Sequence, residues 1–193
     1  MSLFNFLEGF MNIRRANFND IDRISELLLQ VHKVHSDGRS DLFVKGAKKY
    51  QKEELERLIK DENTPIFVYE EEQVIKGYIF AFIQEINSPS LCKIKSLYID
   101  DLCVDKGCRG KGVGTSLYNF IKEYAKSIGC YNITLNVWSF NKNAYKFYKK
   151  CGLNEQKIVM EEILDKWKMG FSAHFFVEDF KEDFLLHYIV CTF

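Results

Sequence analysis

The chain has 193 residues, of which 47% are hydrophobic and 28% charged, and its 27 basic and 27 acidic side chains cancel. This length fits one domain, and the composition excludes a disordered, fibrous or disulfide-stabilised miniature protein. The balanced charge excludes a global basic field of the kind that holds proteins on nucleic acids or anionic membranes. Any anionic ligand therefore requires a local site.

Cysteine usage and the amino-terminal sequence indicate the cellular compartment. The six cysteines form no C-x-x-C pair and have no neighbouring histidine pair, so we expect reduced thiols in a cytoplasmic protein and no metal site. The first ten residues lack the basic start of a signal peptide, and no apolar run approaches the ~18 residues of a membrane helix. We interpret residues 1–10 as an N-terminal appendage and expect no membrane partner.

Hydrophobic periodicity and turn residues predict an alternation of strands and helices. In the first half we expect a strand at 13–16, a helix from Asn19 or Asp20 to about 31, a loop at 35–50, a helix at 52–60, and strands at 66–69, 76–86 and 91–104. In the second half we expect a helix from Gly114 to Gly129, a strand at 133–138, a helix at 141–151 and a strand at 157–164. This order predicts a mixed sheet with helices on its faces.

Residues 165–193 differ from the rest of the chain. Trp167, Phe171 and Phe175 recur every four residues, and so do Phe180, Phe184 and Tyr188. This spacing is typical of an aromatic helical face. We expect the segment to be an extension that packs on the same domain or on a second subunit, and the second case favours a homodimer.

A glycine-rich run lies between a predicted strand and a predicted helix, with the sequence DKGCRGKGVG at residues 105–114. Glycine permits backbone conformations closed to other residues, and the N–H groups at the start of a helix favour a bound anion. The run therefore predicts a pyrophosphate site, although glycines before a helix can also form a purely structural turn. A Walker loop is excluded because Val113 follows Gly112 where that loop requires Lys.

Two motifs resemble the GNAT superfamily of acyl-CoA-dependent N-acetyltransferases. The acyl-CoA loop of that family has the form Gln/Arg-x-x-Gly-x-Gly/Ala, which Arg109, Gly112 and Gly114 match, and Asn141 and Tyr148 stand in the order of a second family motif. The resemblance implies an acyltransferase domain over residues 11–164. Its expected fold is a mixed, mostly antiparallel sheet of about six to seven strands with splayed central strands and about four helices.

The resemblance also implies that acetyl-CoA is the co-substrate and lies between the splayed strands, with its pyrophosphate on the glycine-rich loop. The residues expected to bind acetyl-CoA are Leu102, Cys103, Val104, Arg109, Gly110, Lys111, Gly112, Val113, Gly114, Asn141, Ala144 and Tyr148. Asn141 also suits the N-cap of the predicted helix, and the two roles are compatible. The resemblance implies no metal.

Acetyl transfer from a thioester requires an uncharged amine, and an alkyl amine with a pKa of ~10.4 is only about one part in a thousand neutral at pH 7. A carboxylate base near the acetyl group is therefore expected. Asp100 and Asp101 resemble an acidic pair of the polyamine-acetylating branch, which implies Asp100 as the base and Asp101 as the amine contact. In a regular strand they would face opposite sides, so both enter one pocket only if a bulge re-aims one. Either could instead pair with a nearby lysine.

Tyr148 matches the family's general acid, a phenol that protonates the leaving thiolate, although it could also be an interior aromatic residue. The backbone N–H near Cys103 matches the family's oxyanion donor. A cysteine nucleophile would need a neighbouring base, and no Cys–His pairing is evident in the sequence. Asn136 stands where some family members carry a catalytic Glu, so that role cannot be transferred here.

The loop at residues 35–50 lies where the family has its variable acceptor-binding segment. Arg39 is expected to hold an acceptor carboxylate and Asp41 an ammonium group, unless the loop is simply a solvated turn. The resulting hypothesis is direct transfer of the acetyl group to a primary amine of a small molecule in a ternary complex, without nucleic acid. The alternatives are a peptide or ribosomal-protein N-terminal acetyltransferase and a non-catalytic acyl-CoA-binding module.

Overall fold

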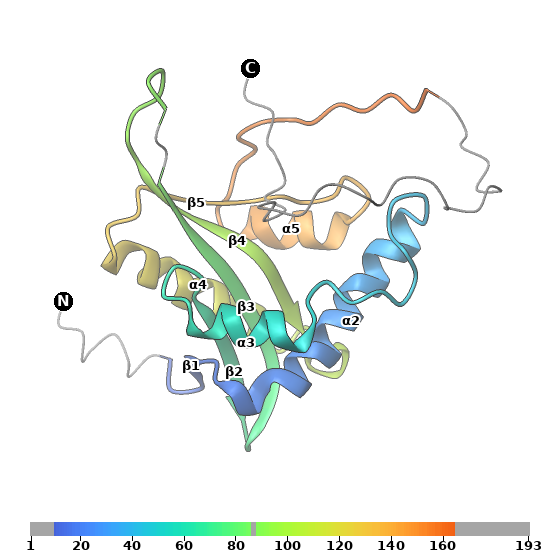
Figure 1. Cartoon of the computed structure of the whole chain (residues 1–193), viewed down its shortest axis with the longest axis vertical. Coiled ribbons are helices and arrows are strands. Elements are labelled where there is room, and N and C mark those ends of the chain that lie inside the picture. Colours follow the sequence, from blue (N-terminus) through green and yellow to red (C-terminus); the bar gives the residue numbers. More distant parts are fainter. Residues whose placement is uncertain (1–9, 86–87, 165–193) are drawn as a thin grey trace. The chain divides into compact units, whose positions relative to one another are not determined.

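The computed structural model of the chain describes residues 10–85 and 88–164. It contains two compact units, Met1–Asn154 and Glu155–Phe193, and each is described by itself. The elements, labelled in Figure 1, are β1 (Ile13–Arg15), η1 (Phe18–Asp20), α2 (Ile21–Gly38), α3 (Lys52–Lys60), β2 (Ile66–Glu71), β3 (Val74–Glu85), β4 (Lys95–Val104), η2 (Lys106–Cys108), α4 (Val113–Ser127), β5 (Asn132–Leu135) and α5 (Lys142–Lys150). No helix in these described ranges is long and apolar enough to cross a membrane.

Both predicted terminal segments fall largely outside the described residues. Of the expected appendage at residues 1–10, only Phe10 is described, and its ring packs edge-on against Phe120 with centroids 5.4 Å apart. The aromatic extension at residues 165–193 lies outside the described residues. The homodimer expectation, which depends on that extension, therefore stays a prediction.

The predicted mixed sheet is confirmed, with the strand order β1-β2-β3-β4-β5. The first four strands pair antiparallel, and β5 pairs with β4 in parallel. The expectation of six to seven strands is wrong for the described residues, which contain five. The expected strand at residues 157–164 is also wrong, because this segment forms no strand and its side chains are exposed, Met160 at 86%. An apolar run specifies a strand only where a neighbouring strand supplies its hydrogen bonds.

A capping box starts the short helix η1 directly before α2, and α2 extends further than the periodicity predicted. The Asn17 side chain accepts a hydrogen bond from the Asn19 N–H at 2.9 Å, and the Asp20 carboxylate accepts one from the Asn17 N–H at 2.8 Å. The helix then continues to Gly38, so the loop expected from residue 35 begins only at Arg39. No glycine or proline interrupts the helix before Gly38, which explains the extra length.

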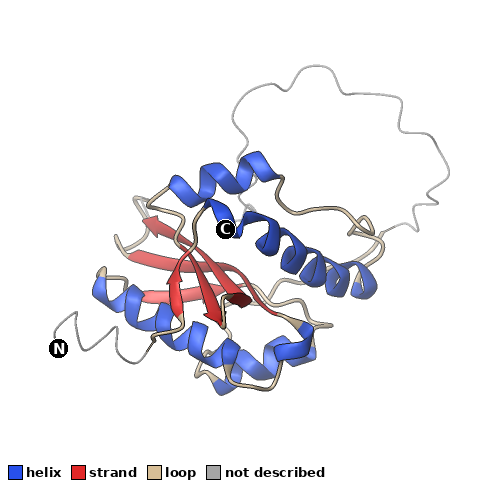
Figure 2. Cartoon of the chain, turned by 90° about the horizontal axis from the view of Figure 1, so that it is seen from below, coloured by secondary structure: helices blue, strands red, loops and turns tan. Residues whose placement is uncertain are grey.

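The sheet is covered on both sides by helices, as Figure 2 shows. Helices α2 and α3 pack on one face, which we call the α2–α3 face, and α4 packs on the other, the α4 face. Strand residues alternate between the two: Ile79 and Phe67 belong to the α4 face, and Tyr78, Phe80 and Val68 to the α2–α3 face.

A β-bulge interrupts the longest ladder of the sheet. Phe80 pairs with Asp101 and Ala81 pairs with Ile99, which leaves Asp100 as an extra residue in β4. The bulge changes the alternation, because Ile99 faces α4 whereas Cys103, two positions after Asp101, faces α2 and α3. The pairing of β5 with β4 ends at Ile99 and Leu135, directly before the bulge. Strand β4 therefore continues from Asp100 to Val104 after it separates from β5.

Gly77 allows β3 to approach β4 and α4 closely. A Cβ atom at this position would lie 2.6 Å from the carbonyl oxygen of Cys103 and 3.3 Å from side-chain atoms of Leu117 and Val113. Backbone cannot yield like a flexible side chain, so only glycine fits here without displacing β4.

We expect Gly77→Ala to destabilise the protein by about 1–3 kcal/mol, because the added methyl group overpacks the junction of β3, β4 and α4. The free energy of unfolding is measured by urea denaturation. Gly107→Ala is the matched control, since a Cβ there would meet its nearest atom at an ordinary 3.5 Å. Equal stability of the two variants would contradict this packing constraint.

Candidate active site

The bulge brings both carboxylates of the acidic pair to the α2–α3 face. Asp100 accepts hydrogen bonds from the Lys49 ammonium and from the Tyr50 hydroxyl, each at 2.8 Å. Asp101 accepts one from the Tyr78 hydroxyl at 3.0 Å. The condition stated from the sequence, that a bulge must re-aim one of them, is met by the bulge at Asp100.

The charges of this cluster depend on one another. Burial raises the pKa of Asp101 to about 6, the positive charge of Lys49 works against this increase, and the negative charge of Asp100 adds to it. Burial lowers the pKa of Lys49, but the attraction of Asp101 and Asp100 outweighs it, so the net pKa is raised. Lys49 is therefore a cation at neutral pH, while Asp101 titrates just below neutrality.

Tyr148 lies on α5, near the carboxyl end of the helix. Burial raises the pKa of its phenol, and the negative charge of Asp101 raises it further, so the two groups lie within electrostatic range of each other. No hydrogen bond of the Tyr148 hydroxyl occurs within the described part of the chain. The side chain is thus a protonated, uncommitted donor at neutral pH, as a general acid requires.

The cysteines near the site are unsuited to carry an acyl group. Burial raises the pKa of the Cys103 thiol to about 12, and its Sγ donates to the carbonyl oxygen of Leu27 at 3.4 Å. Burial also raises the pKa of Cys151. Because the thiolate is the reactive form, these environments oppose a covalent acyl-cysteine.

The glycine-rich loop forms an open turn at the start of α4. Gly112 is the N-cap residue with φ of 87°, and Gly110 has φ of 78°, both in the left-handed region that favours glycine. A Cβ atom at either position would meet no atom within 4 Å, so the surface above the loop is open. The first N–H groups of α4 have no partner within the helix and, with the helix dipole, favour an anion there.

The side chains of this loop have different surroundings. The Arg109 Nε donates to the carbonyl oxygen of Val104 at 3.1 Å, which ties the loop to the end of β4. Lys111 is exposed. Arg109 therefore supports the shape of the loop, and its remaining guanidinium nitrogens can still add positive charge.

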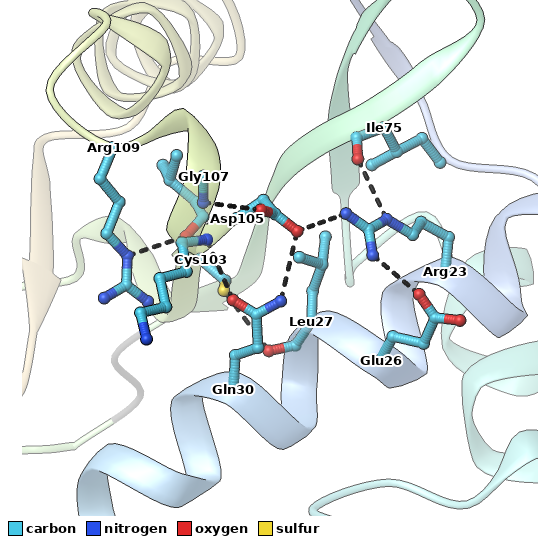
Figure 3. Close-up of polar contacts among 11 residues, drawn as sticks. Arg23, Glu26, Leu27, Gln30, Ile75, Cys103, Asp105, Gly107 and Arg109 are labelled. Carbon is cyan, nitrogen blue, oxygen red and sulfur yellow. Dashed lines mark hydrogen bonds and ion pairs between the residues drawn. The ribbon is translucent and has the colours of Figure 1, made fainter.

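Helix α2 holds the start of the loop in place, as Figure 3 shows. Asp105 pairs with the Arg23 guanidinium, and the same oxygen accepts a hydrogen bond from the Gln30 amide at 3.3 Å. Its other oxygen accepts one from the Gly107 N–H at 2.9 Å, and the Gln30 amide oxygen accepts one from the Lys106 N–H at 3.1 Å. These contacts fix the turn that precedes the glycines.

The predicted cofactor residues surround the place where β4 and β5 separate. Leu102, Cys103 and Val104 form the part of β4 that β5 no longer pairs with, and Gly110, Gly112 and Gly114 follow at its end. Asn141 caps α5, where its side chain accepts a hydrogen bond from the Ala144 N–H at 3.1 Å. Its expected N-cap role is confirmed, and its contact with the cofactor stays a prediction.

The residues predicted to bind the acceptor, Arg39 and Asp41, are paired with each other. The Arg39 Nε lies 2.9 Å and one terminal nitrogen 2.7 Å from the two carboxylate oxygens of Asp41. The guanidinium also lies 5.9 Å from the ring centroid of Trp138, and Trp138 packs against Phe43. In this arrangement Arg39 and Asp41 form an ion pair with each other, and the contacts with Trp138 and Phe43 hold the loop in place.

The sequence interpretation missed Lys49, Tyr50 and Tyr78, which contact the acidic pair directly. The adjacent residues Lys49 and Tyr50 end the predicted loop, so a basic residue there was visible but had no assigned partner. Tyr78 has the apolar environment of a strand residue, and only its register opposite Cys103 places its hydroxyl near Asp101.

The comparisons with known proteins identify the family of the chain. Residues 29–153 match the acetyltransferase (GNAT) family. An uncharacterized N-acetyltransferase of Bacillus subtilis is 32% identical over 146 residues, which cover 75% of this chain and 91% of that protein. A glucosamine 6-phosphate N-acetyltransferase of Arabidopsis thaliana is 37% identical over 71 residues, covering 37% of this chain and 46% of that protein, so this match spans less than half of either.

A solved structure shows the same fold. The crystal structure of a mutant protein from Bacillus halodurans superposes with a TM-score of 0.76 at 30% sequence identity, over 79% of this chain and 98% of that chain. The family match includes the glycine-rich loop, the acidic pair and Tyr148. With these three features in place around the separation of β4 and β5, the chain belongs to the acetyltransferase (GNAT) family and is an acetyl-CoA-dependent acyltransferase.

Proposed function

We propose that the protein transfers the acetyl group of acetyl-CoA to a primary amine of a small molecule by direct attack in a ternary complex. The observation that carries this proposal is the position of Asp101. Its carboxyl, with a pKa of about 6, accepts a hydrogen bond from the Tyr78 hydroxyl at 3.0 Å and lies within electrostatic range of both the Lys49 ammonium and the Tyr148 phenol. A base and an acid are thus available around one point of the site.

The chain's own groups fit acetyl-CoA. Its bound thioester supplies a carbonyl carbon that an amine can attack. The open turn at Gly110 and Gly112 and the N–H groups of α4 suit a pyrophosphate, and Arg109 and Lys111 add positive charge. The unpaired edge of β4 from Leu102 to Val104 offers backbone groups to an amide-containing chain such as pantetheine, and the N–H near Cys103 suits a developing oxyanion.

We assign both the proton acceptor and the contact with the acceptor amine to Asp101. The sequence resemblance had implied Asp100 as the base and Asp101 as the amine contact. Asp100 already accepts hydrogen bonds from Lys49 and Tyr50, whereas the pKa of Asp101, raised to about 6, matches a base that works near neutral pH. Tyr148 then supplies the proton for the departing thiolate.

The acceptor class is inferred from an aromatic contact of the loop at residues 39–50 and from the relatives. The plant relative is named for an amino sugar that carries a phosphate, which is a small molecule with a primary amine and an anionic group. The packing of Phe43 against Trp138 joins the acceptor loop to the segment after β5. This contact favours a small acceptor over an extended peptide.

Calorimetric titration with acetyl-CoA, followed by a panel of amines with thiol release monitored, tests the proposal. We expect saturable binding and amine-dependent release of the thiol. Binding without release for every amine would favour a non-catalytic acyl-CoA-binding module, and release only with peptide amino termini would favour a peptide acetyltransferase. Absence of binding would contradict the role of the glycine-rich loop.

We expect Tyr148→Phe to lower kcat about a hundredfold and to change the Kd for acetyl-CoA less than about twofold, because only the transferable proton is removed. Steady-state kinetics and calorimetry measure the two quantities. Tyr145→Phe is the matched control, since Tyr145 lies on the same helix and is exposed. An unchanged kcat in Tyr148→Phe would remove Tyr148 as the acid.

The pH dependence of kcat/KM separates the two carboxylates. Asp101 accepts a proton only as a carboxylate, so the rate should rise with pH through its pKa of about 6. Asp101→Asn should abolish this rise. Asp100→Asn should retain the rise of kcat/KM with pH but shift its midpoint to lower pH, because the charge of Asp100 contributes to the raised pKa of Asp101. Loss of the rise in Asp100→Asn alone would return the role of base to Asp100.

A further inference from the structure

We propose that Lys49 determines acceptor specificity, selecting primary amines that carry an anionic group such as a carboxylate or phosphate and rejecting amines with a second positive charge. This proposal rests on the proposed function and narrows its substrate class. The acidic pair by itself would predict the opposite specificity, since two carboxylates on one strand would favour a polyamine.

Lys49 reaches the acceptor end of the site from the loop before α3. Its Nζ lies 2.8 Å from the Asp100 carboxylate and 3.4 Å from the Asp100 carbonyl oxygen, and 5.4 Å from the ring centroid of Tyr50. The lysine ammonium has three N–H donors, so these contacts leave one for an oxygen atom of a ligand. The Lys49 side chain is 39% exposed, so it lies at the surface of the protein.

The charge balance around Lys49 leaves room for one further cation. Asp101 and Asp100 attract the ammonium, Tyr98 adds to the attraction, and the positive charge of Lys49 in turn helps to lower the pKa of the half-buried His35. With Asp100 paired to Lys49, a single carboxylate, Asp101, remains to meet the amine of an acceptor. A second ammonium on the acceptor would encounter Lys49 itself and be repelled.

The segment around Lys49 has a net positive charge, like Lys49 itself. Residues 39–52 contain five basic side chains and one acidic one. Asp41, the acidic one, is neutralised by Arg39, and Lys49 is paired with Asp100, so the charge left to this segment comes from Lys45, Lys48 and Lys52. A carboxylate or phosphate on the acceptor is attracted by this segment, and a polyamine is repelled.

Three probes with the same primary amine and the same carbon chain test the charge of the remote group. Butylamine has no charged tail, 4-aminobutanoate has an anionic one and 1,4-diaminobutane has a cationic one. With the full-length protein and acetyl-CoA, we expect kcat/KM for 4-aminobutanoate to exceed that for 1,4-diaminobutane by about tenfold or more, with butylamine between them.

Variants at Lys49 and at its neighbour show whether this lysine sets the order. Lys49→Met should lower the ratio of the two kcat/KM values about tenfold, whereas Lys49→Arg, which keeps the charge, should preserve it. Lys48→Met is the matched control, because it removes one exposed positive charge from the same loop. A general loss of activity from damaged structure would lower all three kcat/KM values and leave their ratio unchanged.

The outcomes distinguish this proposal from the proposed function. A wild-type protein that acetylates 1,4-diaminobutane as well as 4-aminobutanoate would overturn the role of Lys49 and leave the acetyltransferase activity intact. Equal ratios in Lys49→Met and Lys48→Met would do the same. If none of the probes is turned over, their binding to the CoA-loaded protein by calorimetry gives the order, and equal affinities overturn the proposal. Failure to bind acetyl-CoA would overturn both.

Discussion

The β-bulge at Asp100 is the constraint on which the site depends. One extra residue in β4 shifts the alternation of its side chains, so Ile99 before the bulge faces α4 whereas Cys103, four positions later, faces α2 and α3. It also stands where β5 stops pairing with β4. A regular strand would send Asp100 and Asp101 to opposite faces and would keep β5 in register. The same local irregularity therefore creates the acidic pair and the unpaired edge of β4 that suits a cofactor.

Helix α2 connects the two ends of the site. Its Arg23 and Gln30 side chains hold Asp105 at the start of the glycine-rich loop, while its carboxyl end leads into the loop that begins at Arg39. Contacts of Phe43 with His35 and Trp138 join that loop back to α2 and to the segment after β5. Because one helix supports both the glycine-rich loop and the loop that begins at Arg39, the fold sets the distance between the two loops.

Local signals predicted the elements that have local causes. The left-handed glycines before α4, the cap at Asn141 and the apolar face of α4 are encoded within a few residues, and the structure has each of them. Features that depend on contacts between residues far apart in the sequence could not be predicted from local signals. The sequence could state that a bulge was required near Asp100, but the register of β3 decides where it falls. The prediction of a strand at residues 157–164 was wrong for the same reason, since a hydrophobic pattern does not show whether a neighbouring strand is available for pairing.

The acidic pair shows most clearly how tertiary context changes the chemistry of a motif. Burial raises the pKa of Asp101, and the negative charge of the adjacent Asp100 raises it further, which favours the protonated form that cannot act as a base. Lys49 opposes this, because its charge lowers the pKa of Asp101 and leaves it at about 6. A single cation from a distant loop thus both tunes the proposed base and reduces the negative charge that a polyamine would need. Loops that differ at this one position can give the same acidic pair a different substrate, so the pair alone does not specify the acceptor.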